Sequence, residues 1–189
     1  MRLLSLDTSF SPVNVAVIEE GRVVACLYQD TGKKTLEEIP TLLRRLGIDP
    51  QQVDAYAVSV GVGYLTSLRI GITFVKTLAY LSRKPVVGYE NLQVMGLFTP
   101  VEEPKMCLLR VSNNTFYRLF EGGKVGPVEL LSGELPEGRR LGLKEQGLGE
   151  LEFFPFSAYG GLWAYRKLRE GYQGDDPMHL EPLYFKPPV

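Results

Sequence analysis

Histidine is nearly absent from this chain: its 189 residues include only one, His179. Most zinc and iron sites, Ser-His triads and Cys-His pairs draw on histidine, so a histidine-rich metal site is excluded and we expect no metal. His179 lies close to Asp175 and Asp176 near the carboxyl end, which is typical of a surface residue rather than a catalytic base. A serine protease is disfavoured too, because no serine stands in a Gly-x-Ser-x-Gly elbow.

Long apolar runs, a strong charge of one sign and paired cysteines are also missing. The amino terminus turns polar after Leu6, and no run approaches the roughly 20 apolar residues of a membrane span, so we expect a cytoplasmic protein without membrane contact. The net charge of -1 gives no broad basic surface, and any RNA contact is expected to be local or indirect. Cys26 and Cys107 lie in separate apolar, strand-like runs, which predicts buried, reduced, structural thiols.

The first half of the chain combines strands with helices. The segments "RLLSLDTS" and "PVNVAVIEEGRVVACLYQ" predict three antiparallel strands. The segment "TLEEIPTLLRRLG" predicts a helix that Thr35 caps and Gly47 ends, with Pro40 kinking it or displacing its start. A strand in "VDAYAVSVG", a helix over residues 67–82 and a strand in "VVGY" then form a crossover, so the half as a whole predicts a mixed α/β sheet.

The second half restarts the strand pattern at Lys105, with "MCLLRV" and "TFYRLFEGGKVGPVELL". An irregular stretch covers residues 132–149, and "GGLWAYRKLREG" predicts a short amphipathic helix. The segment "TPVEEP" breaks every periodicity. We therefore expect an N-terminal α/β lobe over residues 1–99, which carries the helices described below, and a smaller C-terminal α/β lobe over residues 100–189.

The segment "SVGVGYLTSLRIG", residues 59–71, places Gly61 and Gly63 between a strand and a helix, as a phosphate-binding turn does. A dinucleotide fingerprint needs a third glycine where this chain has Thr66, and an acidic residue about 20 positions on, whereas the next one here is Glu90. No Gly-x-x-x-x-Gly-Lys-[Ser/Thr] loop occurs either. We therefore interpret Gly61, Gly63 and Thr66 as a turn that shapes the entry to the helix.

The helix over residues 67–82 is apolar around most of its circumference. Leu68, Ile72, Val75, Leu78 and Ala79 form one arc, and Ile70, Phe74 and Leu81 form another. Such a helix packs against its own sheet and against a second partner, which is either another part of this chain or another protein. The helix over residues 35–46 can join it in one surface. The candidates for a partner interface are Leu42, Leu46, Leu68, Arg69, Gly71, Ile72, Val75, Lys76 and Ala79.

These segments resemble the TsaB (YeaZ) family, whose members are partner subunits of TsaD in bacterial tRNA threonylcarbamoyladenosine synthesis. The resemblance rests on "LLSLDTS", "EEIPTLLRRLG" and "VSVGVGYLTSLRIG" leading to "KPVVGYENL", and more loosely on "RVSNNTFYRLFEGGKV". The family's turn reads Gly-Pro-Gly-Ser-Phe-Thr-Gly-x-Arg-x-Gly. This chain keeps five of its positions: Gly61, Gly63, Thr66, Arg69 and Gly71.

The resemblance implies a two-lobed actin-like, sugar-kinase-like ATPase fold with mixed sheets and a reduced second lobe. It implies a non-catalytic subunit without a cofactor that binds and activates a TsaD-like threonylcarbamoyltransferase. A TsaE-like ATPase would bind through that heterodimer, tRNA would be contacted only indirectly, and the chain alone would form a homodimer through the same helices. TsaD-like proteins hold a metal through a pair of histidines, so a chain with one histidine is expected to be the partner instead.

The alternative from another class is a small ATP-dependent kinase-like enzyme of the same superfamily, with Asp7 and Thr8 as its nucleotide-binding residues. Active members use acidic residues at the first strand of each lobe, and the second lobe here offers Arg110 and Ser112 in that place. Without a second acid, the favoured interpretation is that the Asp7 carboxylate caps the turn between the first two strands.

Overall fold

The computed structural model describes residues 1–32 and 35–185 of the chain. Its contacts divide these into two compact units, each with its own five-stranded sheet. Unit 1 consists of Met1–Glu90 together with Pro155–Leu183, and unit 2 consists of Asn91–Phe154 together with Tyr184 and Phe185. The expected α/β class with mixed sheets is confirmed.

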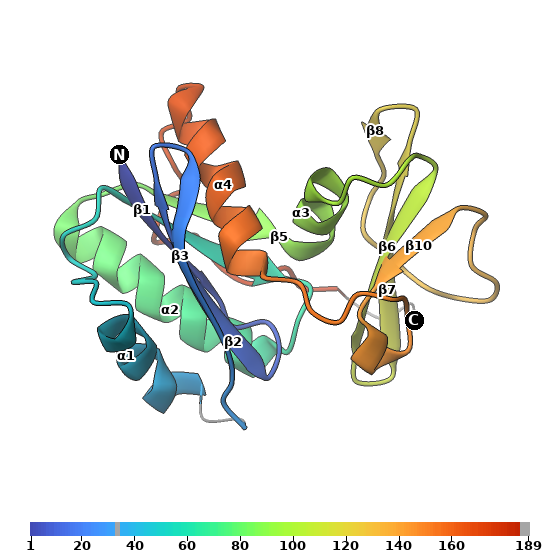
Figure 1. The fold of residues 1–189 in the computed structure, drawn as a ribbon, viewed down its shortest axis with the longest axis horizontal. Coiled ribbons are helices and arrows are strands. Elements are labelled where there is room, and N and C mark those ends of the chain that lie inside the picture. Colours follow the sequence, from blue (N-terminus) through green and yellow to red (C-terminus); the bar gives the residue numbers. More distant parts are fainter. Residues whose placement is uncertain (33–34, 186–189) are drawn as a thin grey trace. The chain divides into compact units, whose positions relative to one another are not determined.

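The sheet of unit 1 has the order β3-β2-β1-β4-β5 (Figure 1). The first three strands form an antiparallel meander, and β4 and β5 add to β1 in parallel, as the crossover pattern predicted. The strands are β1 (Arg2–Asp7), β2 (Pro12–Glu19), β3 (Arg22–Asp30), β4 (Ala55–Gly61) and β5 (Val86–Glu90).

Three helices cover the two faces of this sheet. The helices α1 (Thr35–Arg45) and α2 (Leu65–Ser82) share one core with Leu4 and Leu6 of β1. The helix α4 (Phe156–Arg169) covers the opposite face, where Gly161 lies close to Ser5 and Ile18 (Figure 1). Because side chains alternate across a strand, Leu4 and Leu6 point to one helical layer and Ser5 points to the other.

The ends of α1 show which of the local sequence signals set the bounds of the helix. Gly47 adopts a φ of +64° and ends the helix, as predicted. Thr35 is the first helical residue, so the residue before it would be the cap, and that residue lies outside the described ones. Pro40 lies inside the helix and does not displace its start.

Unit 2 was predicted less completely. Its sheet has the order β10-β6-β7-β8, with β9 pairing β7. The helix α3 (Asn91–Phe98), which has no strong apolar periodicity, and the strand β10, which lies in the stretch interpreted as irregular, were both missed. The remaining elements are β6 (Lys105–Val111), β7 (Asn114–Glu121), β8 (Lys124–Val125), β9 (Glu129–Leu130), β10 (Arg139–Gly142) and a short 3-10 helix, Lys144–Gln146.

The units differ from the expected lobes of residues 1–99 and 100–189. Unit 2 begins directly after β5, because α3 packs on β6 and β7. Near its end the chain returns to unit 1, because α4 packs on the sheet of that unit. Gly160 and Gly161 allow this return, since a Cβ at Gly160 would lie 2.4 Å from the Tyr89 ring. A return over such a sequence distance leaves no local signal.

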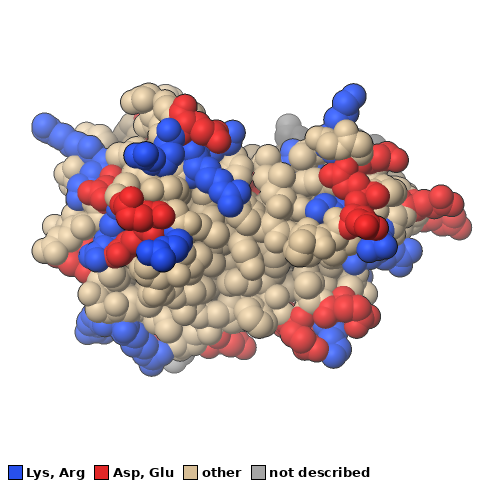
Figure 2. Space-filling model, turned by 45° about the horizontal axis from the view of Figure 1, so that its top comes forward, with Lys and Arg blue, Asp and Glu red and all other residues tan. Residues whose placement is uncertain are grey.

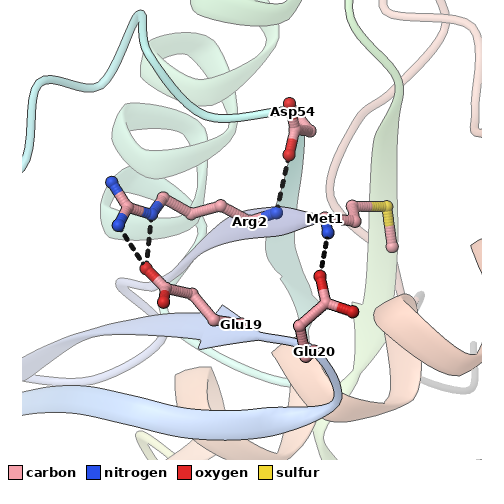
Figure 3. Close-up of polar contacts among 5 residues, drawn as sticks. All are labelled: Met1, Arg2, Glu19, Glu20 and Asp54. Atoms are coloured by element: carbon pink, nitrogen blue, oxygen red, sulfur yellow. Dashed lines mark hydrogen bonds and ion pairs between the residues drawn. The ribbon is translucent and has the colours of Figure 1, made fainter.

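Charges of both signs are interspersed on one face of the molecule (Figure 2). On the face drawn in Figure 2, Lys and Arg alternate with Asp and Glu instead of forming a patch of one sign. Figure 3 shows one such cluster: Arg2 pairs with Glu19, the amino terminus pairs with Glu20, and the Arg2 N–H donates to Asp54 at 2.7 Å. These contacts tie the start of β1 to the β2–β3 turn and to the residues before β4.

The single-residue expectations have mixed outcomes. The His179 ring is exposed and contacts the Asp176 carboxylate at 2.5 Å, as expected for a surface residue. Cys107 is buried as predicted, but the prediction for Cys26 was wrong, because this residue is exposed on β3, an edge strand.

Among the described residues, no group of His, Cys, Asp and Glu is arranged to hold a metal ion. No helix in residues 1–32 or 35–185 combines the length and apolarity needed to cross a bilayer.

Candidate partner interface

The glycines of residues 59–71 make room for the loop between β1 and β2. Gly61 has a φ of +128°, which side chains rarely adopt. A Cβ on Gly63 would lie 2.7 Å from the Ser9 carbonyl oxygen, and a Cβ on Gly71 would lie 2.3 Å from the Thr8 hydroxyl. The loop is also hydrogen-bonded to this turn, because the Tyr64 N–H donates to Ser9 O at 2.9 Å. The turn therefore packs against the chain's own β1–β2 loop, in the space that a bound ligand would otherwise occupy.

Asp7 is enclosed in this loop and is only 1% exposed. One carboxylate oxygen accepts from the backbone N–H and the hydroxyl of Ser9, and the other accepts from the Asn14 amide at 3.0 Å. Burial raises the pKa of the Asp7 carboxyl above its usual value, while the hydrogen bonds from Ser9 and Asn14 lower it. Thr8 is fully buried, and its hydroxyl donates to Ser67 O at 2.6 Å. The contacts are those of a turn that fastens β1 to β2 and α2, as favoured from the sequence.

The inner face of α2 belongs to the core of unit 1. Leu68, Ile72, Val75 and Ala79 are 1–2% exposed and join the hydrophobic cluster of β1, β2 and β4, and Leu42 of α1 is fully buried there as well. The prediction that these five side chains lie at a partner interface was therefore wrong. The physical reason is that the helix of a strand–helix–strand crossover covers its own sheet, and this arc does so.

The other candidates divide between core and surface. Leu46 is half-buried against the same core, and Gly71 is buried against Thr8. The Lys76 ammonium donates to Leu180 O at 3.5 Å, which directs it toward the segment after α4. Arg69 is exposed and is the candidate that lines an open groove.

This groove lies on the outer face of α2, beside the first turn of α1. Its volume is about 590 Å³. Ile70, Phe74 and Leu78 form its floor and are only partly buried, and Leu36, which contributes from α1, is 62% exposed. The complete lining is Leu36, Thr66, Arg69, Ile70, Thr73, Phe74, Thr77 and Leu78.

A second hollow of about 560 Å³ continues the groove toward the start of α2. It shares Thr66 and Ile70 with the first hollow and extends to Ser11, Thr35 and Tyr64. Together the two hollows form a continuous, mainly apolar strip with hydroxyl groups along its margin. We refer to the lining of both hollows as the α1/α2 groove.

The sequence analysis recognised both apolar arcs of α2 but took most of the candidates for the partner interface from the first arc, which is buried. The signal that separates them is side-chain size. Gly71 and Ala79 lie on the inner arc, where the helix approaches the rest of the fold closely, and Phe74 and Leu81 lie on the outer one. Leu36 shares the helical periodicity of Ile39, Leu42 and Leu43, which predicted one apolar face, but in the first turn of α1 it is 62% exposed.

Known proteins resemble this chain in sequence and in structure. Residues 32–117 match the family TsaD, tRNA N6-adenosine threonylcarbamoyltransferase. The tRNA threonylcarbamoyladenosine biosynthesis protein TsaB of Bacillus subtilis is 27% identical over 113 residues, which are 53% of this chain and 49% of that protein. The TsaB of Haemophilus influenzae is 35% identical over 99 residues, which are 51% of this chain and 42% of that protein.

The solved structure of YeaZ from Pseudomonas aeruginosa superimposes with a TM-score of 0.70 at 20% identity, and covers 97% of this chain and 99% of that one. The chain is similar in sequence to the TsaD family and to TsaB proteins, and similar in fold to YeaZ. The match to YeaZ confirms the fold that the resemblance implied, including a reduced second lobe.

Proteins named as the transferase itself also resemble this chain. A tRNA N6-adenosine threonylcarbamoyltransferase of Thermodesulfovibrio yellowstonii is 27% identical over 148 residues, which are 65% of this chain and 44% of that protein. The chain therefore spans about half the length, or less, of the curated relatives that it matches. The YeaZ fold, in contrast, is matched over almost its whole length.

Proposed function

We propose that this chain is a non-catalytic subunit that binds and activates a TsaD-like threonylcarbamoyltransferase, which modifies adenosine in tRNA beside the anticodon. The similarity to proteins named TsaB supports a place in tRNA threonylcarbamoyladenosine synthesis, and the α1/α2 groove supports the role of a partner subunit. The observation that carries the proposal is this groove, because an apolar helix face with Leu36 62% exposed beside it is typical of a protein–protein contact.

The composition supports the partner role over that of the transferase. The TsaD-like subunit holds its metal through a histidine pair, and this chain has one histidine, which is exposed and paired with Asp176. Asp7, the acid that a kinase-like enzyme would use, already accepts hydrogen bonds from Ser9 and Asn14 at both oxygens. No observation favours the kinase-like alternative.

The groove also supports the expected order of assembly. Paralogues that share this fold carry equivalent helices, so a pair of helices here can pack against a pair from a TsaD-like protein. The same surface can pair with a second copy when the partner is absent, and this homodimer would compete with the heterodimer. A TsaE-like ATPase would join the heterodimer. Because the net charge of the chain is -1, we infer that tRNA contacts it only indirectly.

Light scattering during size-exclusion chromatography tests the proposal. The purified chain is mixed with the TsaD-like protein encoded in the same genome, with and without ATP and magnesium. A one-to-one complex is the expected result, with saturable ATP binding absent from the isolated chain. If no complex forms and the chain alone binds ATP, the kinase-like alternative replaces the proposal.

A further inference from the structure

A hollow of about 730 Å³ lies where α2 ends, and the described residues that line it do not belong to the α1/α2 groove. One wall is the last turn of α2 with the residues that lead into β5, and the other is the segment after α4, residues 173–177. A smaller hollow of about 170 Å³ shares Tyr80 and Leu81 with the first. The side chains that carry the positive charge and the exposed apolar area of both hollows are Lys76, Tyr80, Leu81, Arg83, Lys84 and Met178, and we refer to them as the α2-end surface.

The wall formed by the segment after α4 is held in place by hydrogen bonds to β5. The Asp175 N–H donates to Val86 O at 2.7 Å, and one oxygen of the Asp175 carboxylate accepts from the Gly88 N–H at 2.7 Å. The other carboxylate oxygen accepts from the Tyr172 hydroxyl at 2.5 Å. Among the described residues that line the two hollows, Asp175 is the single acid, and both of its oxygens already accept hydrogen bonds within the chain.

Lys76, Arg83 and Lys84 give this surface its positive charge. The Lys76 ammonium donates to Leu180 O at 3.5 Å. The Lys84 ammonium donates to Gln51 O at 2.6 Å, so both lysines contact neutral oxygens. Arg83 is exposed, and within residues 1–32 and 35–185 none of the three cations forms an ion pair. An approaching anion therefore meets three cations and a single acid that is already hydrogen-bonded.

Arg83 stands at a backbone position that favours glycine. It follows Ser82, the last residue of α2, and adopts the left-handed conformation with a φ of +53°. Its N–H ends the helix by donating to the carbonyl of Tyr80. Glycine is the usual residue at such a helix end, because it adopts this conformation without a penalty from a Cβ. A change of Arg83 to glycine therefore removes the guanidinium without weakening the helix end.

The apolar side chains of this surface are widely exposed. Leu81 is 73% exposed, Met178 is 72% exposed and Tyr80 is 63% exposed. A single exposed apolar side chain is ordinary, but three that line two adjoining hollows form a patch, which is typical of a contact with another molecule. Because cations lie beside this patch, its complement in charge and polarity carries both carboxylates and an apolar side chain.

We propose that the α2-end surface binds an acidic peptide segment of another protein, in which a large apolar side chain stands between carboxylates. The carboxylates pair with Arg83 and Lys84, since the planar guanidinium suits a carboxylate in particular. The apolar side chain packs on Tyr80, Leu81 and Met178. Surfaces that bind single-stranded nucleic acid combine cations with aromatic rings, whereas two of the three apolar side chains here are aliphatic. A peptide is therefore the better fit.

This inference goes beyond the proposed function and does not depend on it. The six side chains of the α2-end surface are absent from the lining of the α1/α2 groove, as far as the described residues go. The smaller hollow touches the groove at Thr77. The two surfaces can therefore be changed separately, and failure of one proposal leaves the other standing.

Fluorescence anisotropy with a defined probe tests the binding. The probe is the labelled peptide Gly-Glu-Glu-Phe-Glu-Leu-Glu-Gly, titrated with the full chain at a salt concentration of about 0.15 M. One control peptide has Gln in place of every Glu, and another has Ala in place of Phe and Leu. We expect saturable binding of the probe and a dissociation constant at least about tenfold higher for either control and for a single-stranded oligonucleotide of equal charge. No binding of the probe, equal binding of the Gln control, or tighter binding of the oligonucleotide overturns the proposal.

Matched variants of the chain locate the binding site. Arg83→Gly should melt no lower than the wild type, while its dissociation constant for the probe rises at least about fivefold; Arg83→Gln should show the same loss of affinity. Arg44→Gln removes the same charge from an exposed position of α1 outside the lining of the hollows and the groove, and should change the constant less than about twofold.

The apolar part of the surface is tested by Leu81→Ala. Because this side chain is 73% exposed, the variant should melt like the wild type, and its dissociation constant for the probe should rise at least about threefold. If Arg83→Gly and Arg44→Gln bind the probe equally, the attraction is to net charge alone and the proposal is overturned. A loss of binding in the groove variant Thr73→Glu but not in Arg83→Gly would place the probe in the α1/α2 groove and overturn it as well.

Discussion

Both faces of α2 carry large apolar side chains, but the two faces differ in what they contact. Val75 is 1% exposed against the sheet, while its neighbour Phe74 lies in the floor of the α1/α2 groove. Hydrophobicity alone does not tell a core face from a docking face, because both exclude water. The inner face carries Gly71, where the close approach of Thr8 leaves no room for a larger side chain. A charge should therefore unfold the protein on one face and block its partner on the other.

The largest effect is expected on the inner face. Val75→Glu buries an unpaired carboxylate among Leu68, Ile72 and the strands of the sheet, and should destabilise the fold by at least about 4 kcal/mol. The far-ultraviolet circular dichroism of the purified variant measures this. A Val75→Glu chain that melts like the wild type would contradict the placement of the inner face.

A smaller loss is expected where α2 meets the β1–β2 loop. Gly71→Ala places a methyl group 2.3 Å from the Thr8 hydroxyl, and should destabilise the fold by about 2 kcal/mol in urea unfolding. Thr8→Ala removes the obstructing atoms, so the double variant should be more stable than the sum of the two single changes predicts. If the effects of the two changes on the free energy of unfolding were strictly additive, the contact with Thr8 would not be what excludes a side chain at position 71.

On the groove side, truncation should leave stability unchanged and weaken binding. Leu36→Ala shortens an exposed side chain, so its melting temperature should match the wild type, while the affinity for the TsaD-like protein should fall about fivefold, or about 1 kcal/mol. Isothermal titration calorimetry measures this. An unchanged affinity would remove Leu36 from the interface.

The smallest effect concerns Asp7 and pH. Burial raises the pKa of its carboxyl, so the stability that Asp7 contributes is full below the unfolded pKa of about 4 and is lost as pH rises through the folded pKa. The difference in unfolding free energy between the wild type and Asp7→Asn should therefore narrow from pH 4 to pH 7. A difference that widens with pH would mean that hydrogen bonds from Ser9 and Asn14 outweigh burial.

The sequence predicted most of the strands and helices of unit 1, but it predicted little about which helix faces are exposed. Alternation in "PVNVAVIE" and the end at Gly47 identified strands and a helix, because these signals act over a few residues. The return of α4 to unit 1 and the burial of Leu42 depend on contacts between distant segments, which leave no local trace. Asp7 was interpreted as a turn residue because the second lobe offers no matching acid, and the hydrogen bond from the Ser9 N–H to its carboxylate agrees with that interpretation.

The most direct test of the central claim compares two variants that each add one negative charge. Thr73→Glu places the charge in the groove, and Gln52→Glu places it at an exposed position outside the groove lining. Both should fold like the wild type. Titration with the TsaD-like protein should show at least about a tenfold loss of affinity for Thr73→Glu and none for Gln52→Glu. Equal affinities for the two variants would contradict the claim that the outer face of α2 is the partner interface.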